Sequence, residues 1–197
     1  MYYSENKIGR IEVICGPMFA GKTEELIRRV KRMEYAKKKF LVFKPNIDDR
    51  YSLDEVVSHN QKRTKAININ VNHPEDIKNY VTSEVSALVF DEVQFFNEKL
   101  IDIINYYANQ GLRIICAGLD KDFTSKPFGL IPSLLAIADE VTKLTAICMV
   151  CGEEATETQR ILDGKPAYDD DAQVLIGAKE SYEARCRKCH VVLHHHE

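Results

Sequence analysis

The chain has 197 residues, of which 45% are hydrophobic, enough to bury the core of one domain with a small appendage. Its 27 basic and 30 acidic residues give a net charge of −3, which argues against a surface built to bind nucleic-acid phosphates or anionic lipids. The sequence has neither an apolar signal segment at its start nor a run of about 18 apolar residues. We therefore expect a cytoplasmic protein that binds small molecules, with no nucleic-acid or membrane partner.

Strands and helices are predicted to alternate over most of the chain. In chain order the sequence predicts a strand at 11–15, a helix at 24–36, a strand at 39–45, a surface loop at 46–65, a strand at 66–71, a helix at 74–84, a strand at 86–92, a helix from Lys99 that stops at Gly111, and a strand at 112–118. Such alternation is typical of an α/β fold, a mostly parallel sheet with helices on both faces.

The character of the sequence changes near residue 147. Short strands, glycines and cysteine pairs replace the helices from there on. We therefore expect an α/β nucleotide-binding domain at 1–146 and a small second domain at 147–193. Residues 194–197, mostly histidine, are set aside as a candidate remnant of a purification tag.

The first predicted strand and helix are joined by GPMFAGKT, which fits the pattern G-x-x-x-x-G-K-[ST]. In this pattern the backbone N–H groups cradle nucleotide phosphates and the lysine adds positive charge. An ordinary glycine turn is the alternative, but the strand before the loop and the helix after it are the context that a phosphate loop requires. The residues predicted to bind the phosphates of ATP are Gly16, Pro17, Met18, Phe19, Ala20, Gly21, Lys22 and Thr23.

A second piece of nucleotide chemistry is predicted where the strand at 86–92 ends on Asp91 and Glu92. A carboxylate at the tip of a strand beside a phosphate loop can hold Mg²⁺, so we assign the ion to Asp91 and the hydroxyl of Thr23. Glu92 would accept a proton either from water, as in an ATPase, or from a substrate hydroxyl, as in a kinase. The alternative is a pair of acids that only favours the start of the following helix.

The six cysteines are of two kinds. Cys15 and Cys116 lie in apolar strands, where a cysteine usually acts as a small buried hydrophobe. The other four form two C-x-x-C pairs separated by 34 residues, which is typical of a closed structural zinc site. The predicted zinc ligands are Cys148, Cys151, Cys186 and Cys189. Two redox pairs are the competing interpretation, and His190 is the alternative to Cys189 as a ligand.

Taken together, the motifs resemble those of type II thymidine kinases, the form found in bacteria and in animal cytosol. The segments that carry the resemblance are GPMFAGKT, KPNIDDRYS, DEVQFF, GLDKDFTSKPFG, TKLTAICMVCG and IGAKESYEARCRKC, in this order from about residue 11 to 189. The resemblance implies transfer of the γ-phosphoryl group of ATP to the 5′-hydroxyl of thymidine, giving dTMP and ADP. It also implies a zinc-ribbon domain that carries a substrate lid, a homotetramer, and feedback inhibition by dTTP.

The resemblance further implies roles for individual residues. Glu92 would be the general base, Arg50 would neutralise charge on the transferred phosphoryl group, and Lys22 would complete the catalytic set. The ATP site would also include Asp48, Arg50, Asp91 and Gln94. The residues implied in nucleoside binding are Met18, Glu92, Phe95, Leu119, Phe123, Phe128, Thr158, Gln173, Val174, Leu175, Ile176, Gly177 and Tyr182. Thr158 would lie near the base methyl, and 173–177 would read the base mainly through backbone groups.

Two other functions stay open at this stage. One is a remodelling ATPase in which Glu92 activates water. The other is a zinc-ribbon module that binds nucleic acid and keeps a vestigial nucleotide site. The acidic residues of 151–173 argue against the second, because such a module needs a basic surface.

Overall fold

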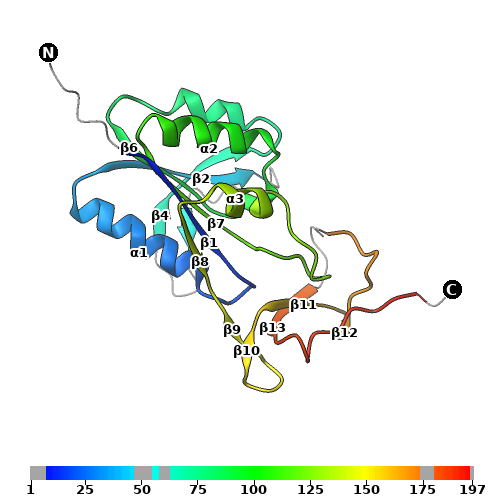
Figure 1. Ribbon diagram of the computed structural model, residues 1–197. Helices are drawn as coiled ribbons and strands as arrows, with labels where there is room; N and C mark the ends of the chain where they lie inside the picture. Colours follow the sequence, from blue (N-terminus) through cyan, green and yellow to red (C-terminus); the bar gives the residue numbers. More distant parts are fainter. Residues whose placement is uncertain (1–7, 47–54, 58–62, 174–179, 196–197) are drawn as a thin grey trace, which may run out of the picture.

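The computed structural model describes residues 8–46, 55–57, 63–173 and 180–195. Its centre is a sheet of strand order β5-β2-β6-β7-β1-β8 in which every pairing is parallel (Figure 1). The bounds of these strands are β1 (Arg10–Cys15), β2 (Lys39–Asn46), β5 (Ile67–Asn70), β6 (Val85–Phe90), β7 (Arg113–Gly118) and β8 (Glu140–Lys143). The predicted α/β fold is confirmed.

Helices cover both faces of this sheet because its strands carry apolar side chains on both sides. The helices are α1 (Lys22–Tyr35), α2 (Lys99–Asn109) and α3 (Ile131–Ile137), with short 3₁₀ helices η1 (Pro74–Asn79) and η2 (Val93–Phe95). In β1, Val13 and Cys15 face the core under α2 and α3, whereas Ile14 faces the core under α1. No helix within the described ranges is long and apolar enough to cross a membrane.

Helix α1 follows the predicted pattern closely. Its apolar positions recur at helical spacing, and Leu26, Ile27, Val30 and Met33 are buried against the sheet. Acidic residues occupy its first turn, where they favour the helix dipole. Because α1 begins directly after the phosphate loop, its seat on the sheet also sets the position of that loop.

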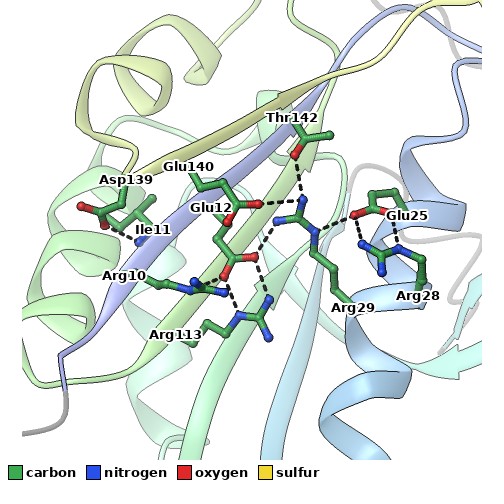
Figure 2. A network of polar contacts seen from close by, with 10 residues as sticks. All are labelled: Arg10, Ile11, Glu12, Glu25, Arg28, Arg29, Arg113, Asp139, Glu140 and Thr142. Atoms are coloured by element: carbon green, nitrogen blue, oxygen red, sulfur yellow. Dashed lines mark hydrogen bonds and ion pairs between the residues drawn. The ribbon is translucent and has the colours of Figure 1, made fainter.

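One polar side chain interrupts the apolar strand β1. Glu12 is fully buried. Its carboxylate oxygens lie 2.5 Å from Nη1 of Arg29, 2.6 Å from Nε of Arg113 and 2.6 Å from Nε of Arg10 (Figure 2). Burial raises the pKa of Glu12, but the charge and hydrogen bonds of these guanidinium groups outweigh burial and hold the pKa below its ordinary value. Glu12 is therefore ionised, and the three guanidinium groups balance its negative charge inside the domain.

Arg29 extends this cluster from α1 to the edge of the sheet. Its guanidinium donates to Oε1 of Glu25 at 2.8 Å and to Oγ1 of Thr142 at 2.7 Å, and it lies 3.2 Å from Oε1 of Glu140 (Figure 2). Apolar packing holds α1 on the sheet without fixing direction, whereas these directed bonds fix the helix relative to β1 and β8.

Two local predictions are corrected by the structure, and two elements were not predicted. The stretch 46–65 is not all loop, since β3 (Glu55–Val57) and β4 (Arg63–Lys65) pair as an antiparallel hairpin, as suits runs that contain β-branched residues. The helix predicted at 74–84 is only the short η1, in which Pro74 and Ile77 are the buried residues. The helix α3 and the edge strand β8 were not predicted as separate elements.

The chain ends in a region of short strands, called here the C-terminal region (residues 146–195). It contains β9 (Ala146–Ile147), β10 (Glu154–Ala155), β11 (Glu157–Leu162), β12 (Lys165–Pro166) and β13 (Glu180–Arg185). Strands β9 and β10 form one hairpin, and β12-β11-β13 form an antiparallel sheet beside the carboxyl ends of the main strands (Figure 1). The first half of β11 is buried, which indicates that this sheet packs against other parts of the chain. The domain boundary at 146/147 stays a prediction.

Candidate active site

A cavity of about 780 Å³ lies where the carboxyl ends of the main strands meet the C-terminal region. The predicted site residues that line it are Met18, Phe19, Gly21, Lys22, Thr23, Glu92, Phe95, Leu119, Phe123, Phe128, Thr158, Gln173 and Tyr182. Glu24, Lys121 and Asp122 also line it and were not predicted. Gly16, Pro17, Ala20, Asp91 and Gln94 flank these residues in the chain without lining the cavity.

The phosphate loop (residues 16–23) joins β1 to α1, as the sequence predicts. Gly16 and Gly21 have φ angles of 143° and 81°, which suit residues without a side chain. A Cβ atom at Gly16 would lie 2.3 Å from the carbonyl oxygen of Leu144, so a larger residue would displace the loop from the strand behind it. Phe19 also has a positive φ, of 65°, at the outer turn of the loop.

Lys22 lies at the start of α1 and turns back over the loop. Its Nζ donates to the carbonyl oxygen of Pro17 at 2.7 Å. Burial lowers the pKa of Lys22, and the carboxylates of Glu92, Asp91 and Asp120 partly oppose that effect. The ammonium group of Lys22 therefore lies in an acidic surrounding and bonds to a backbone carbonyl of the loop itself.

The strand tip after β6 carries the two predicted carboxylates. Asp91 is 5% exposed, and burial together with the charge of Glu92 raises its pKa to about 7. Glu92 adopts a left-handed backbone conformation with φ of 49°, and its N–H donates to Oδ1 of Asp91 at 3.0 Å. Such a backbone costs about 1 kcal/mol in a residue with a side chain, and strain of this kind is common at functional sites.

Gln94 holds Glu92 from behind. Its Nε2 donates to Oε2 of Glu92 at 2.6 Å, while its Oε1 accepts the backbone N–H of Leu119 at 3.1 Å. The contact is so close that a Cβ atom at Gly118 would lie 2.4 Å from Oε1 of Gln94, and one at Gly129 would lie 2.0 Å from its carbonyl oxygen. Gln94 therefore connects the carboxylate to the wall of the cavity that Leu119 begins.

Aromatic side chains form that wall. Phe95 and Phe128 pack edge to face with ring centroids 5.5 Å apart, and Phe123 and Phe128 are buried. The guanidinium of Arg160 lies 5.0 Å above the ring of Phe123. These rings offer a flat apolar ligand a stacking surface.

Polar groups close the other rim of the cavity. Nε2 of Gln173 donates to Oδ2 of Asp122 at 2.9 Å, and the carboxylate of Asp122 also accepts the backbone N–H groups of Thr124 and Lys126. Asp122 thereby shapes the loop that carries the phenylalanines. The spacing of Asp122, Thr124 and Lys126 is typical of an Asx turn, a signal in the sequence that could have identified it.

Six predicted site residues lie outside the described residues. They are Asp48, Arg50, Val174, Leu175, Ile176 and Gly177. Their roles stay expectations that follow from the resemblance.

The four predicted zinc ligands come together in the C-terminal region. The Sγ atoms of Cys148, Cys151, Cys186 and Cys189 all lie within 4.8 Å of one another. Each pair occupies a tight turn, as shown by the bonds from the N–H of Gly152 to the carbonyl oxygen of Cys148 (2.9 Å) and from that of Cys189 to Cys186 (3.0 Å). The cluster has the donor set of a tetrahedral zinc site and could hold the ion.

The four thiols of this cluster differ in pKa. Burial raises the pKa of Cys148, but backbone N–H groups, among them those of Cys186 and Cys151, outweigh it and lower the pKa to about 6. Backbone N–H groups also lower the pKa of Cys186 and favour its thiolate. For Cys151 a backbone group at Glu153 lowers the pKa, but hydrogen bonds with the neighbouring sulfur atoms outweigh it and raise the pKa, and such bonds raise the pKa of Cys189 to about 12. A thiolate is the form that binds metal. The alternative ligand His190 is turned away, since its Nε2 donates to the carbonyl oxygen of Phe123 at 2.9 Å.

Comparison with known protein families agrees with these features. A family model described as thymidine kinase matches residues 9–190. The match covers most of the chain and includes the phosphate loop, both strand-tip carboxylates, the aromatic wall and all four clustered cysteines. The resemblance seen in the sequence motifs is thereby confirmed. The chain belongs to the thymidine kinase family.

Proposed function

We propose that the protein transfers the γ-phosphoryl group of ATP to the 5′-hydroxyl of thymidine, producing dTMP and ADP. The observation that carries the proposal is that the phosphate loop and the aromatic wall line one and the same cavity, with Glu92 among the lining residues. A kinase needs both substrates in one enclosure so that the nucleophile meets the phosphate away from water. Membership of the thymidine kinase family supports the choice of nucleoside.

On the phosphate side, the backbone of residues 16–23 would hold the β- and γ-phosphates. Lys22 would exchange its bond with the Pro17 carbonyl for the phosphate oxygens. Thr23 and Asp91 would hold Mg²⁺, which supplies charge neutralisation on the phosphates when it is bound with ATP. Asp91 fits this role because a buried carboxylate next to Glu92 needs a counter-charge. Arg50 and Asp48 join this side through the family resemblance.

On the nucleoside side, Glu92 would accept the proton of the 5′-hydroxyl as that oxygen attacks the γ-phosphorus. The bond from the γ-phosphorus to the bridging oxygen then breaks, and ADP leaves with the electron pair. Gln94 holds one oxygen of Glu92, so the carboxylate enters the reaction already oriented. General base catalysis of this kind contributes about 10² to 10⁴ in rate.

The base would lie against Phe95, Leu119, Phe123 and Phe128, with Met18, Thr158 and Tyr182 completing the enclosure. We propose that residues 173–177 read the base through backbone groups, so that deoxycytidine and purine nucleosides are poor substrates. The four clustered cysteines would hold a structural zinc ion. A homotetramer inhibited by dTTP completes the proposal and follows from the family resemblance.

The proposal is tested by a coupled ADP-release assay on a panel of nucleosides, with no nucleoside as the blank. We expect thymidine to stimulate ADP release strongly, deoxycytidine and deoxyguanosine weakly, and dTMP to appear in equal amount with ADP. ADP release at the same rate with and without thymidine would instead identify an ATPase and overturn the proposal.

A further inference from the structure

The phosphate loop has a direct hydrogen bond to the C-terminal region. The backbone N–H of Met18 donates to Oγ1 of Thr158 at 3.0 Å, across 140 residues of sequence. Thr158 lies on β11 and is only 4% exposed, so little solvent competes for this bond although the residue lines the cavity. A loop N–H is thus committed to a side chain of another part of the fold.

Two further loop residues face the same way. Gly16 lies against the carbonyl oxygen of Leu144, which would be 2.3 Å from a Cβ atom at this position. Ala20 packs against the small apolar cluster that Ala146 and Cys148 form with Ala155 and Ala184. Gly16, Met18 and Ala20 therefore face, in turn, Leu144, Thr158 and the small apolar cluster. Lys22 and Thr23 of the same loop line the cavity.

These three contacts differ in what they can determine. The contacts of Gly16 and Ala20 limit how near the loop comes, whereas the bond to Thr158 has a direction. It holds the N–H side of the Pro17–Met18 peptide, whose carbonyl side bonds to Nζ of Lys22, so the two bonds together fix the rotation of this peptide. Rotation of one peptide in a phosphate loop changes where the neighbouring N–H groups point, and those groups bind the phosphates. The hydroxyl of Thr158 therefore bears on the ATP half of the site, although its side chain comes from the other region.

We propose that Thr158 is a positioning residue for the phosphate loop, acting through its hydroxyl on the Met18 N–H. This role is separate from contact of its methyl group with a base. The inference rests on the proposed function only in taking ATP as the ligand of the loop. It makes the C-terminal region part of the ATP site before any nucleoside binds.

The test compares Thr158→Val with Thr158→Ser in the full zinc-loaded chain. Valine keeps the shape and removes the acceptor, whereas serine keeps the acceptor and removes the methyl group. Calorimetric titration with Mg·ATP, without nucleoside, should show about 3- to 10-fold weaker binding for Thr158→Val and binding within about 2-fold of the unaltered chain for Thr158→Ser. Thr156→Val is the matched control, because that hydroxyl bonds to Glu157 and not to the loop.

Amide hydrogen exchange of residues 16–23 supplies a second measurement that does not need ATP. Exchange should be faster in Thr158→Val and unchanged in Thr158→Ser and Thr156→Val. If valine releases zinc, Thr158→Ala replaces it in both measurements.

Unaltered ATP affinity and loop exchange in Thr158→Val, or equal losses in Thr158→Ser, would overturn the proposal. Failure of the unaltered chain to bind ATP would count against the proposed function, and hydrogen exchange would still decide the role of Thr158.

Discussion

Glu12 and Asp91 are both buried carboxylates, and they differ in how fully the chain balances their charge. Glu12 is surrounded by Arg10, Arg29 and Arg113, and its pKa lies below the ordinary value (Figure 2). For Asp91, burial and the charge of Glu92 outweigh the opposing charges of Lys44 and Lys22, and its pKa is raised to about 7. We call the group around Glu12 the complete cluster, because its negative charge is balanced in the folded chain, and the group of Asp91 and Glu92 the incomplete cluster, because its negative charge is not fully balanced.

Asp120, whose charge acts on Lys22 together with those of Glu92 and Asp91, shows a second sign of a missing partner. Oδ1 of Asp120 is buried and has no hydrogen-bond partner among the residues that the structure describes, although Oδ2 lies 2.8 Å from Nζ of Lys143. Unbalanced buried charge is costly, and it is common where a ligand later supplies the balance. Balance by neighbouring charges and hydrogen bonds therefore distinguishes Glu12 from Asp91 and Asp120, whereas burial does not, since all three are buried. The four clustered cysteines resemble the incomplete cluster in this respect, because their sulfur atoms form a donor set for a metal ion that the chain itself does not supply.

The largest effect is expected from breaking the cysteine cluster. Cys151→Ser removes one of four zinc ligands, so the C-terminal region should lose its metal and unfold well before the main sheet. The measurement is elemental analysis, expected to give one zinc per unaltered chain, together with hydrogen exchange resolved along the sequence. Cys116→Ser, a buried cysteine outside the cluster, is the control that should keep its zinc. A metal-free unaltered chain would contradict this prediction.

Breaking the charge cluster around Glu12 should first of all cost stability. Arg29→Met leaves the Glu12 carboxylate with fewer counter-charges and should lower the free energy of unfolding by about 3 kcal/mol, as measured by urea denaturation. The matched control is Arg28→Met, one residue away on α1, because the Arg28 side chain is 58% exposed and pairs only with Glu25 among the described residues. That control should change stability by less than about 1 kcal/mol. Equal effects of the two substitutions would mean that the buried network adds nothing.

The incomplete cluster should give the opposite result, a loss of turnover with little loss of stability. Glu92→Gln keeps the size of the side chain and removes the group that accepts the proton, so kcat should fall about 10²-fold or more. Binding of ATP and thymidine, measured by calorimetry, should stay near the unaltered values. Near-normal turnover would reassign the general base.

A smaller effect is expected on the pH dependence of stability, through the raised pKa of Asp91. Between the ordinary pKa of an aspartate and about 7, the folded chain keeps a proton on Asp91 that the unfolded chain releases. This group therefore makes the folded state less stable as pH rises through that interval. Asp91→Asn removes the effect, so the variant should gain about 1 kcal/mol or more over the unaltered chain between pH 5 and pH 8.

The measurement is urea denaturation at several pH values without nucleotide. Mg·ATP should reduce the gain, because the ion stabilises the ionised carboxylate only in the unaltered chain. A stability difference that does not vary with pH would show that Asp91 titrates as an ordinary carboxyl group.

The sequence predicts those parts of the fold that depend on a short contiguous stretch of residues. The phosphate loop is contiguous from Gly16 to Thr23, and the strands beside it show continuous apolar runs. The cysteine pairs are short local signals as well, although their meeting in space is inferred from chemistry. In each case the spacing of a few residues carries the information.

What the sequence did not predict depends on contacts between distant segments. Glu12 lies 101 residues from Arg113, and Met18 lies 140 residues from Thr158. The residues next to Thr158 in the sequence do not indicate that its hydroxyl accepts a hydrogen bond from the N–H of Met18 in the phosphate loop. The hairpin within 46–65 and the shortness of η1 were missed because charged stretches and short helices give weak periodic patterns.

The place of β1 in the sheet has a consequence for biosynthesis. The hydrogen-bonding neighbours of this strand are β7 and β8, whose residues are translated about a hundred and more positions after it. Until then Val13, Ile14 and Cys15, fully buried in the finished fold, have no sheet to enter. During synthesis this apolar segment therefore waits for about a hundred further residues before its partner strands exist, so the sheet closes around β1 late in folding.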